Sequence, residues 1–418
     1  MDKPIFSLFF LPIFLLLASL SLQLSAEQRP KIATVDLNAL KTIKASLTDI
    51  PGSTFFSTWD FTSPDPCSSF SGLTCSLISS SLRVTALSLG TGLSGSPGLA
   101  GSLSPSLSQL TELTQLFLFP GLVTGPIPSQ LARLTGLRVI SLTNNRLTGP
   151  VPTSLSALTN LHTLDLSYNQ LTGSVPPSLT ELPGLKVLIL ASNSLSGELP
   201  PVSTQLLHLD LNGNKFNGQL PSLPLSLRYL SVSHNSMRGP LNGLASLSNL
   251  VYLDLSMNQF SGSIPAPLFK STLTPLLLQR NNLSGGVLLP PAGPTRPSYG
   301  EGSVVDLSHN MLSGELSTVL VGVENLFLNN NRLMGRVPDE YIESLYRGST
   351  KTLYLQHNYI NGVGLKGGAA ALPNTASVCL SYNCMVPPSV GLTDCPTSAG
   401  SQISRPAWQC PVFNNGRS

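Results

Sequence analysis

Charged side chains are scarce in this sequence of 418 residues, at 10% of the total, and the formal net charge is only +3. So small a charge argues against nucleic acid or an acidic membrane surface as the main partner. Apolar residues nevertheless reach 41%, which excludes a disordered chain. Glycine and proline number 35 each, too many for helical packing. The composition therefore favours many short strands joined by turns.

Motifs that mark common enzyme classes are missing. No G-x-S-x-G, H-E-x-x-H or P-loop sequence occurs, and no kinase region is present. Gly90, Gly92 and Gly95 match the G-x-G-x-x-G dinucleotide motif, but Ser96-Pro97-Gly98 follows where a phosphate-binding helix would have to begin. We interpret them as turn glycines and expect neither catalysis nor a cofactor or metal site.

Only one long apolar run is present, from residue 4 to residue 24. A small residue at the expected cut, Ala26, predicts a signal peptide over residues 1–26. An uncleaved membrane anchor is the alternative, although Pro12 interrupts the run. No second span and no hydrophobic tail for a lipid anchor follow. We therefore expect a secreted product, in the apoplast or cell wall or peripheral at the plasma membrane.

Cysteines are absent from the middle of the chain. An even count in a secreted chain predicts disulfides, here at the two ends of the structure: Cys67, Cys75, Cys379, Cys384, Cys395 and Cys410. A zinc site is the poorer interpretation, because neither group contains a histidine or paired CxxC spacings. We expect Cys67 to pair with Cys75, whereas the last four cysteines allow three pairings.

A repeat fills that middle region. One copy runs Leu137-Arg-Val-Ile-Ser-Leu142-Thr-Asn-Asn145-Arg-Leu147-Thr-Gly149-Pro-Val151-Pro152. Its phase is marked by an asparagine that recurs, with Gly121 in that slot one repeat earlier: Asn145, Asn169, Asn193, Asn214, Asn235, Asn258, Asn281, Asn310, Asn331 and Asn358. A glycine follows each marker by four residues, from Gly125 to Gly362.

Each position of the repeat has a physical role. The Leu-x-Leu alternation predicts a short strand with its leucines on one face, which only stacked copies bury. The asparagine amide is expected to bond backbone groups of neighbouring turns. The glycine permits positive φ or a close backbone approach, and the Pro that follows fixes an extended outer segment.

The repeat, L-x-x-L-x-L-x-x-N-x-L-x-G-x-[IVL]-P, resembles that of plant extracellular leucine-rich-repeat proteins, which include receptor ectodomains and secreted inhibitors. The segment from Asp36 to Leu47, then Trp59 and Cys67 to Cys75, is similar to the family's N-terminal cap, with Phe70 where the family usually has Trp. The resemblance implies an α/β repeat solenoid, a right-handed superhelix with a concave parallel sheet and disulfide-capped ends. The expected domains are a signal peptide (1–26), an N-terminal cap (27–82), a solenoid of about twelve repeats (83–377) and a C-terminal cysteine cap (378–418).

Ligand contacts are expected on the concave sheet, where exposed aromatic and aliphatic side chains are the better candidates. These are Phe117, Phe119, Tyr168, Ile189, Tyr229, Tyr252, Leu277, Phe327 and Tyr354. An acidic stripe of Asp165, Asp210, Asp254 and Asp306 is predicted beside them, either to attract a basic ligand or as ordinary filler residues.

Other polar features of the repeats have less specific interpretations. Five histidines are expected on strand positions of the same face, as ordinary fillers or as a pH-sensitive surface: His162, His208, His234, His309 and His357. Asn282 begins the only glycosylation sequon. Longer steps, with insertions at 90–101, 290–299 and 341–346, are where specificity is expected.

The sequence thus predicts a secreted recognition module rather than an enzyme. Its sheet would span roughly 55–60 Å, enough for an extended peptide or one face of a protein domain. By resemblance, the partner is an extracellular peptide or protein, with a membrane receptor kinase to carry the signal in development or defence. Alternatives are an inhibitor of microbial cell-wall hydrolases, similar to polygalacturonase-inhibiting proteins, and a structural wall protein.

Overall fold

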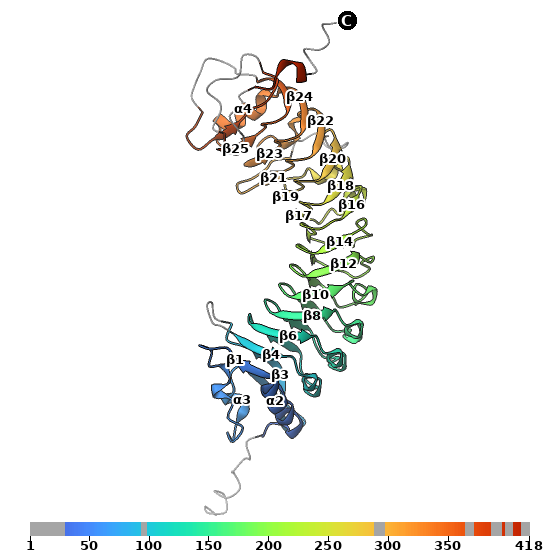
Figure 1. Ribbon diagram of the computed structural model, residues 1–418, viewed down its shortest axis with the longest axis vertical. Helices are drawn as coiled ribbons and strands as arrows, with labels where there is room; N and C mark the ends of the chain where they lie inside the picture. The colour runs from blue at the N-terminus through green and yellow to red at the C-terminus, as the bar shows by residue number, and fades with distance from the viewer. Residues whose placement is uncertain are drawn as a thin grey trace, which may run out of the picture.

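A computed structural model describes residues 30–92, 98–287, 297–363, 372–385, 395–397 and 404–410. The expected signal peptide and most of the insertion at 290–299 lie outside these residues. The described chain forms one curved solenoid (Figure 1). In that view the odd-numbered strands from β17 (Tyr252–Asp254) to β25 (Thr352–Tyr354) lie along the inner side of the arc, and the even-numbered strands from β12 (Ser194–Glu198) to β24 (Arg332–Val337) lie along the outer side.

The leucines of each repeat form the inner sheet. Its first two strands are antiparallel and the others parallel, and among the described residues it has 14 strands. They are β2 (Leu73–Ile78), β3 (Ser81–Leu89), β5 (Gln115–Leu118), β7 (Val139–Ser141), β9 (Thr163–Asp165), β11 (Val187–Ile189), β13 (His208–Asp210), β15 (Tyr229–Ser231), β17 (Tyr252–Asp254), β19 (Leu276–Leu277), β21 (Val304–Asp306), β23 (Asn325–Phe327), β25 (Thr352–Tyr354) and β27 (Ser377–Cys379). In each Leu-x-Leu pattern the two flanking apolar residues are buried. Side chains alternate along a strand, so the residue between them faces the concavity.

The segment around each repeat glycine forms a second set of strands, where the sequence predicted only an extended segment. These lie in one sheet of seven strands, β1 (Leu47–Asp49), β4 (Leu99–Ser102), β6 (Leu122–Pro126), β8 (Arg146–Pro150), β10 (Gln170–Gly173), β12 (Ser194–Glu198) and β14 (Lys215–Asn217). A further six form a second sheet, β16 (Arg238–Gly239), β18 (Gln259–Gly262), β20 (Asn282–Gly285), β22 (Met311–Glu315), β24 (Arg332–Val337) and β26 (Tyr359–Val363). The glycine in question has positive φ in every repeat from Gly125 to Gly335, as expected, but Gly362 does not.

Short helices complete the repeats. The 3-10 helices are η1 (Phe55–Thr58), η2 (Pro105–Gln109), η3 (Ser129–Arg133), η4 (Thr153–Ala157), η5 (Pro177–Leu179), η6 (Asn242–Ser246), η7 (Ala266–Leu268), η8 (Thr318–Leu320) and η10 (Ala407–Gln409). The α-helices are α2 (Thr34–Ser46), α3 (Pro66–Ser69) and α4 (Asp339–Tyr346). Helix α4 occupies the longer step predicted at 341–346, and its Tyr341 and Leu345 are buried in the core. That insertion therefore packs the solenoid interior.

The marker asparagines form a hydrogen-bonded ladder between repeats, as the sequence predicts. Asn169 Oδ1 accepts the backbone N–H of Leu147 from the preceding repeat at 3.0 Å. Its Nδ2 donates to the carbonyl oxygens of Leu142 and Leu166 at 2.8 and 3.2 Å. Asn383 repeats the pattern, with its Oδ1 accepting from Ile360 N at 3.0 Å. The ladder and the inner sheet thus continue past residue 378, where we expected a separate cap to begin.

Packed aromatic rings and a disulfide close the N-terminal end of the solenoid. Trp59 is buried, stacks on Phe70 with ring centroids 5.1 Å apart, and donates from Nε1 to the carbonyl oxygen of Ser71 at 3.0 Å. The predicted disulfide between Cys67 and Cys75 is present. Phenylalanine at position 70 therefore fills the place of the family's usual tryptophan.

The C-terminal end is closed by two disulfides and one arginine. The four cysteines pair as Cys379–Cys395 and Cys384–Cys410, one of the three pairings left open by the sequence. The Arg405 guanidinium lies over the rings of Tyr359 and Tyr382, 4.2 and 4.6 Å from their centroids. Its Nε donates to the carbonyl oxygen of Asn358 at 3.0 Å. No helix within the described ranges is long and apolar enough to cross a membrane.

Candidate functional site

The residues at the middle position of the Leu-x-Leu pattern, at or near the end of each inner strand, form one continuous row, which we call the central row. Strand register places the members side by side in this order: Phe117, Ser141, Asp165, Ile189, Asp210, Ser231, Asp254, Leu277, Asp306, Phe327 and Tyr354. Five predicted apolar or aromatic positions and all four predicted acids therefore share one line on the concave face, each partly exposed.

A stack of three rings lies beside the middle of this row, and we call it the aromatic stack. It consists of His208, Tyr229 and Tyr252, the first residues of three consecutive strands. The His208 and Tyr229 ring centroids are 3.9 Å apart with planes 6° from parallel, and those of Tyr229 and Tyr252 are 4.1 Å and 11° apart. Such pairs contribute about 0.5–1.5 kcal/mol each beyond burial. The stack is therefore a preorganised platform of ring edges and hydroxyl groups, because neighbouring ring faces cover one another.

Each acid of the central row also has a local structural role. The carboxylate Oδ1 of Asp165, Asp210 and Asp254 accepts the backbone N–H two residues later at 3.0 Å, and that of Asp306 does so at 2.9 Å. This Asx turn ends the strand, which supports the filler interpretation of these residues. None of the four forms an ion pair with a lysine, arginine or histidine that the structure describes.

Burial perturbs the titration of this region. It raises the pKa of the Asp210 carboxyl above its ordinary value, an effect opposed by the N–H of Asn212 and by His208. Burial likewise raises the pKa of Asp306 and of Tyr252 and lowers the pKa of His208. A carboxylate with a raised pKa is one for which the folded chain disfavours the charged form.

Replacing Asp210 by asparagine is therefore expected to stabilise the fold at neutral pH. The amide oxygen keeps the Asx-turn acceptor, while the partly buried charge is removed. Because the folded-state pKa is raised, the stability contributed by Asp210 is fully present below its unfolded pKa and is lost as pH rises through the folded pKa. Urea unfolding should give a higher midpoint for Asp210→Asn at pH 7, and this gain should disappear near pH 3. Glu181→Gln, at an exposed position, is the control; a gain of equal size there would contradict the burial argument.

A second aromatic group occupies the C-terminal part of the row. The rings of Phe327 and Tyr354 meet edge to face with centroids 5.4 Å apart, and the Tyr354 hydroxyl lies 3.2 Å from Ser377 Oγ. Phe327 directly follows Asp306 in the row. Aromatic surface thus lies beyond both ends of the acidic part of the row.

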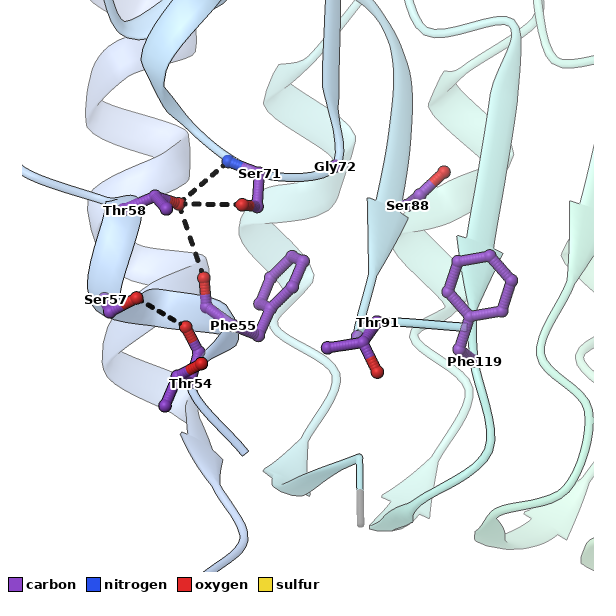
Figure 2. A pocket seen from close by; sticks show the side chains of 10 residues that line it. Thr54, Phe55, Ser57, Thr58, Ser71, Gly72, Ser88, Thr91 and Phe119 are labelled. Carbon is purple, nitrogen blue, oxygen red and sulfur yellow. Dashed lines mark hydrogen bonds between the residues drawn. The ribbon is translucent and has the colours of Figure 1, made fainter. Parts of the chain in front are cut away.

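Phe119 belongs to a different place, an open pocket of about 410 Å³ at the N-terminal end of the inner face. Figure 2 shows its ring on one side of this pocket, with Thr91 and Ser88 between it and Phe55 of the cap. Thr58 bridges to Ser71 on the far wall by hydrogen bonds (Figure 2). The structure thus separates Phe119 from the aromatic stack.

The expectation that all five histidines lie on strand positions is wrong. Only His208 lies within a described strand, and His162 directly precedes β9. The other three sit in the turn after a strand with left-handed backbone, namely His234, His309 and His357 with φ of 52°, 55° and 59°. Tyr168 occupies the same turn position with φ 54° and is 54% exposed, at the edge of the concave face. Histidine and asparagine tolerate this conformation better than most residues, which accounts for their recurrence before the ladder asparagine.

The remaining predicted features are placed as follows. Asn282 is exposed in β20, with its neighbour Leu283 buried, and its glycosylation stays a prediction. After β3 the next described element is β4, and Gly90 and Gly92 have positive φ, as turn glycines do. No group of three or more His, Cys, Asp or Glu side chains arranged to hold a metal ion occurs in the described part of the chain.

Comparison with known proteins supports this architecture. Family models for the leucine rich repeat N-terminal domain and for the leucine rich repeat match residues 33–76 and residues 135–195, 205–225 and 249–271, respectively. Comparison with curated protein sequences finds no significant match.

Three solved structures illustrate the similarity. The ectodomain of the Arabidopsis thaliana receptor kinase GASSHO1/SCHENGEN3, in complex with CASPARIAN STRIP INTEGRITY FACTOR 2, is 27% identical over 84% of this chain and 44% of its own, with a TM-score of 0.68. PEPR1 with AtPEP1 is 27% identical over 89% of this chain and 58% of its own, with a TM-score of 0.64. A plant ice-binding protein is 26% identical over 81% of this chain and 99% of its own, with a TM-score of 0.52.

The chain thus spans about half the length of the two receptor ectodomains that it matches. The ice-binding protein indicates that this architecture also serves ligands other than peptides, so the surface rather than the fold must select the ligand. The cap, the repeats and these structural matches together show a leucine-rich-repeat solenoid that is similar to plant extracellular leucine-rich-repeat proteins.

Proposed function

We propose that the protein is a secreted recognition module that binds a peptide or protein ligand on its concave face. The observation that carries this proposal is the aromatic stack of His208, Tyr229 and Tyr252 beside the central row. Rigid, partly exposed aromatic side chains provide large contact area at small entropic cost and dominate interface energetics. The peptide complexes named for the two similar receptor structures support the same type of ligand.

The proposed setting is the plant cell exterior. Residues 1–26 direct secretion, Asn282 carries a glycan, and a membrane receptor kinase completes the signalling unit in development or defence. The module itself supplies binding and no catalysis. These assignments rest on the sequence features given above and on the similarity of the fold to receptor ectodomains.

The test is capture of partners by the immobilised mature protein from extracellular fluid and plant membrane extracts at about pH 5.5. A double variant, Tyr229→Ala with Tyr252→Ala, is expected to capture the specific partner at least tenfold less, because it removes the platform while leaving the leucine core intact. The partners are identified by cross-linking and mass spectrometry. Tyr346→Ala, at an exposed tyrosine on α4, is the matched control and should capture normally.

The identity of the captured partner separates the possible roles. A secreted peptide or a receptor ectodomain supports the recognition role. Cell-wall hydrolases alone, with inhibition at nanomolar protein, would replace that role by the inhibitor role. Equal capture by the wild-type protein and the double variant would show that the aromatic stack is not the binding site.

A further inference from the structure

The acids of the central row follow a strict alternation. Along consecutive strands from β9 to β21, an aspartate occupies every second strand, at Asp165, Asp210, Asp254 and Asp306. Ile189, Ser231 and Leu277 occupy the strands between them. Neighbouring strands are about 4.8 Å apart, so the carboxylates repeat at about 9.6 Å along the solenoid axis.

This spacing excludes a shared metal ion, because a calcium ion needs its oxygen ligands within about 2.6 Å. It suits an elongated ligand with cationic groups at a regular interval. In a polyproline-II segment, three residues advance about 9.3 Å and complete one turn, so every third side chain points the same way. Such a segment would bring every third side chain opposite a carboxylate.

Two unpaired acceptors lie just after strands of the same sheet, one of them beyond the last acid. Strand β25 lies two places beyond β21, and two residues after its Tyr354 comes Gln356, which is only 5% exposed. The Oε1 atom of Gln356 is buried and has no hydrogen-bond partner, and neither has that of Gln279, two residues after Leu277. A buried acceptor without a donor in the chain is costly, so these two oxygens require a donor from outside the chain, either water or a ligand.

The aromatic stack supplies a second means of holding a cation. Tyr229 and Tyr252 lie two residues before Ser231 and Asp254 in the same strands, and therefore on the same face of the sheet. His208 and Tyr252 cover the two faces of the Tyr229 ring, so the stack offers a guanidinium group paired with Asp254 the tyrosine hydroxyl oxygens as acceptors rather than an open ring face.

We infer that the concave face binds an extended basic peptide segment with arginine or lysine at every third residue. This inference rests on the proposed function and names its ligand class. The four acids span six strand steps, about 29 Å. A polyproline-II segment of about ten residues covers that length and presents four cations, one for each aspartate.

The test uses two synthetic peptides of ten residues and identical composition. One, Arg-Pro-Pro-Arg-Pro-Pro-Arg-Pro-Pro-Arg, carries arginine at every third position; the other has the four arginines together, followed by six prolines. Titration calorimetry with the full secreted chain at 50 mM salt should give at least tenfold tighter binding of the periodic peptide. Binding should weaken as salt is raised, since the contacts are ionic.

Matched variants assign that binding to the row. Asp210→Asn combined with Asp254→Asn retains both Asx-turn acceptors and should weaken the periodic peptide at least tenfold. Glu181→Gln, which removes one exposed charge outside the row, should leave its affinity unchanged. Equal affinity for the two peptides, or no effect of the double asparagine variant, would overturn the inference.

The two failures are distinguishable. If the periodic peptide does not bind selectively but a captured partner still depends on Tyr229 and Tyr252, the basic-peptide inference is wrong and the proposed function stands. If neither the peptide nor any captured partner depends on the concave face, both are wrong.

Discussion

Replacing Asp36 by alanine is expected to lower the free energy of unfolding by about 3 kcal/mol, because it removes the nearer and buried counter-charge of Arg83 and leaves only the half-exposed Glu112, 3.5 Å away. Asp36 is 0% exposed in helix α2. Its two carboxylate oxygens accept from Arg83 Nη2 and Nε, both at 3.0 Å, and Oδ2 also accepts from Val84 N at 2.9 Å. The residue thus joins the cap helix to the first long strand of the solenoid.

Fluorescence reports this loss at the cap itself. The chain has two tryptophans, Trp59 buried in the cap and Trp408, which is 74% exposed near the C-terminus. In a Trp408→Phe background, urea unfolding followed by tryptophan emission monitors the N-terminal end alone. Asp60→Ala, at an exposed acid of the same cap, should change stability by less than about 1 kcal/mol. Equal losses for Asp36→Ala and Asp60→Ala would contradict the proposed importance of the ion pair.

Asn358→Ala is the second large effect, with an expected loss of about 1–3 kcal/mol in the free energy of unfolding. Asn358 is 0% exposed, and its Oδ1 accepts from Leu333 N at 2.9 Å. Its Nδ2 donates to the carbonyl oxygens of Leu328 and Leu355, each at 3.0 Å. Alanine leaves the buried Leu333 N–H without this acceptor, at a cost of about 1–3 kcal/mol. The oxygens of Leu328 and Leu355 each lose one of two donors, since Asn331 and Asn383 still donate to them.

An exposed asparagine provides the comparison for Asn358. Asn249 donates one hydrogen bond, from Nδ2 to the carbonyl oxygen of Leu225 at 2.8 Å, and lies outside the ladder. Its replacement by alanine should cost less than about 1 kcal/mol in the same circular-dichroism urea titration. A loss below 1 kcal/mol at Asn358 would mean that the ladder does not hold successive repeats together.

The repeat made much of this architecture predictable. The spacing of Asn169 from its neighbours in the sequence sufficed to predict that its amide bonds adjacent turns, because every copy repeats the same short-range geometry. The alignment of the central row was predictable for the same reason. In a parallel stack with constant phase, equivalent residues such as Asp210 and Asp254 must fall on one line.

Contacts that join unlike segments were not predictable. The ion pair of Asp36 with Arg83 links residues 47 positions apart, one in the cap and one in the solenoid, and no periodicity relates them. The C-terminal cysteine pairing depends on how the chain returns across the last repeat, which spacing alone leaves open. The expectation for the histidines was wrong for another reason. It extended the side-chain alternation of the strand into the turn that follows, where residues such as His309 have a left-handed backbone.

The candidate site was predictable in position and not in arrangement. The sequence indicated that Tyr229 and Tyr252 face the concavity, but the near-parallel stacking with His208 depends on side-chain rotamers fixed by packing across three strands.

The most direct test of the central claim is the affinity of the captured extracellular partner for the wild-type protein and for the Tyr229→Ala, Tyr252→Ala double variant, measured by titration under the same conditions. We expect saturable binding by the wild type and at least tenfold weaker binding by the variant, with both proteins unfolding at the same urea concentration within error. Unchanged affinity in a correctly folded variant would contradict the claim that the concave face is the recognition surface.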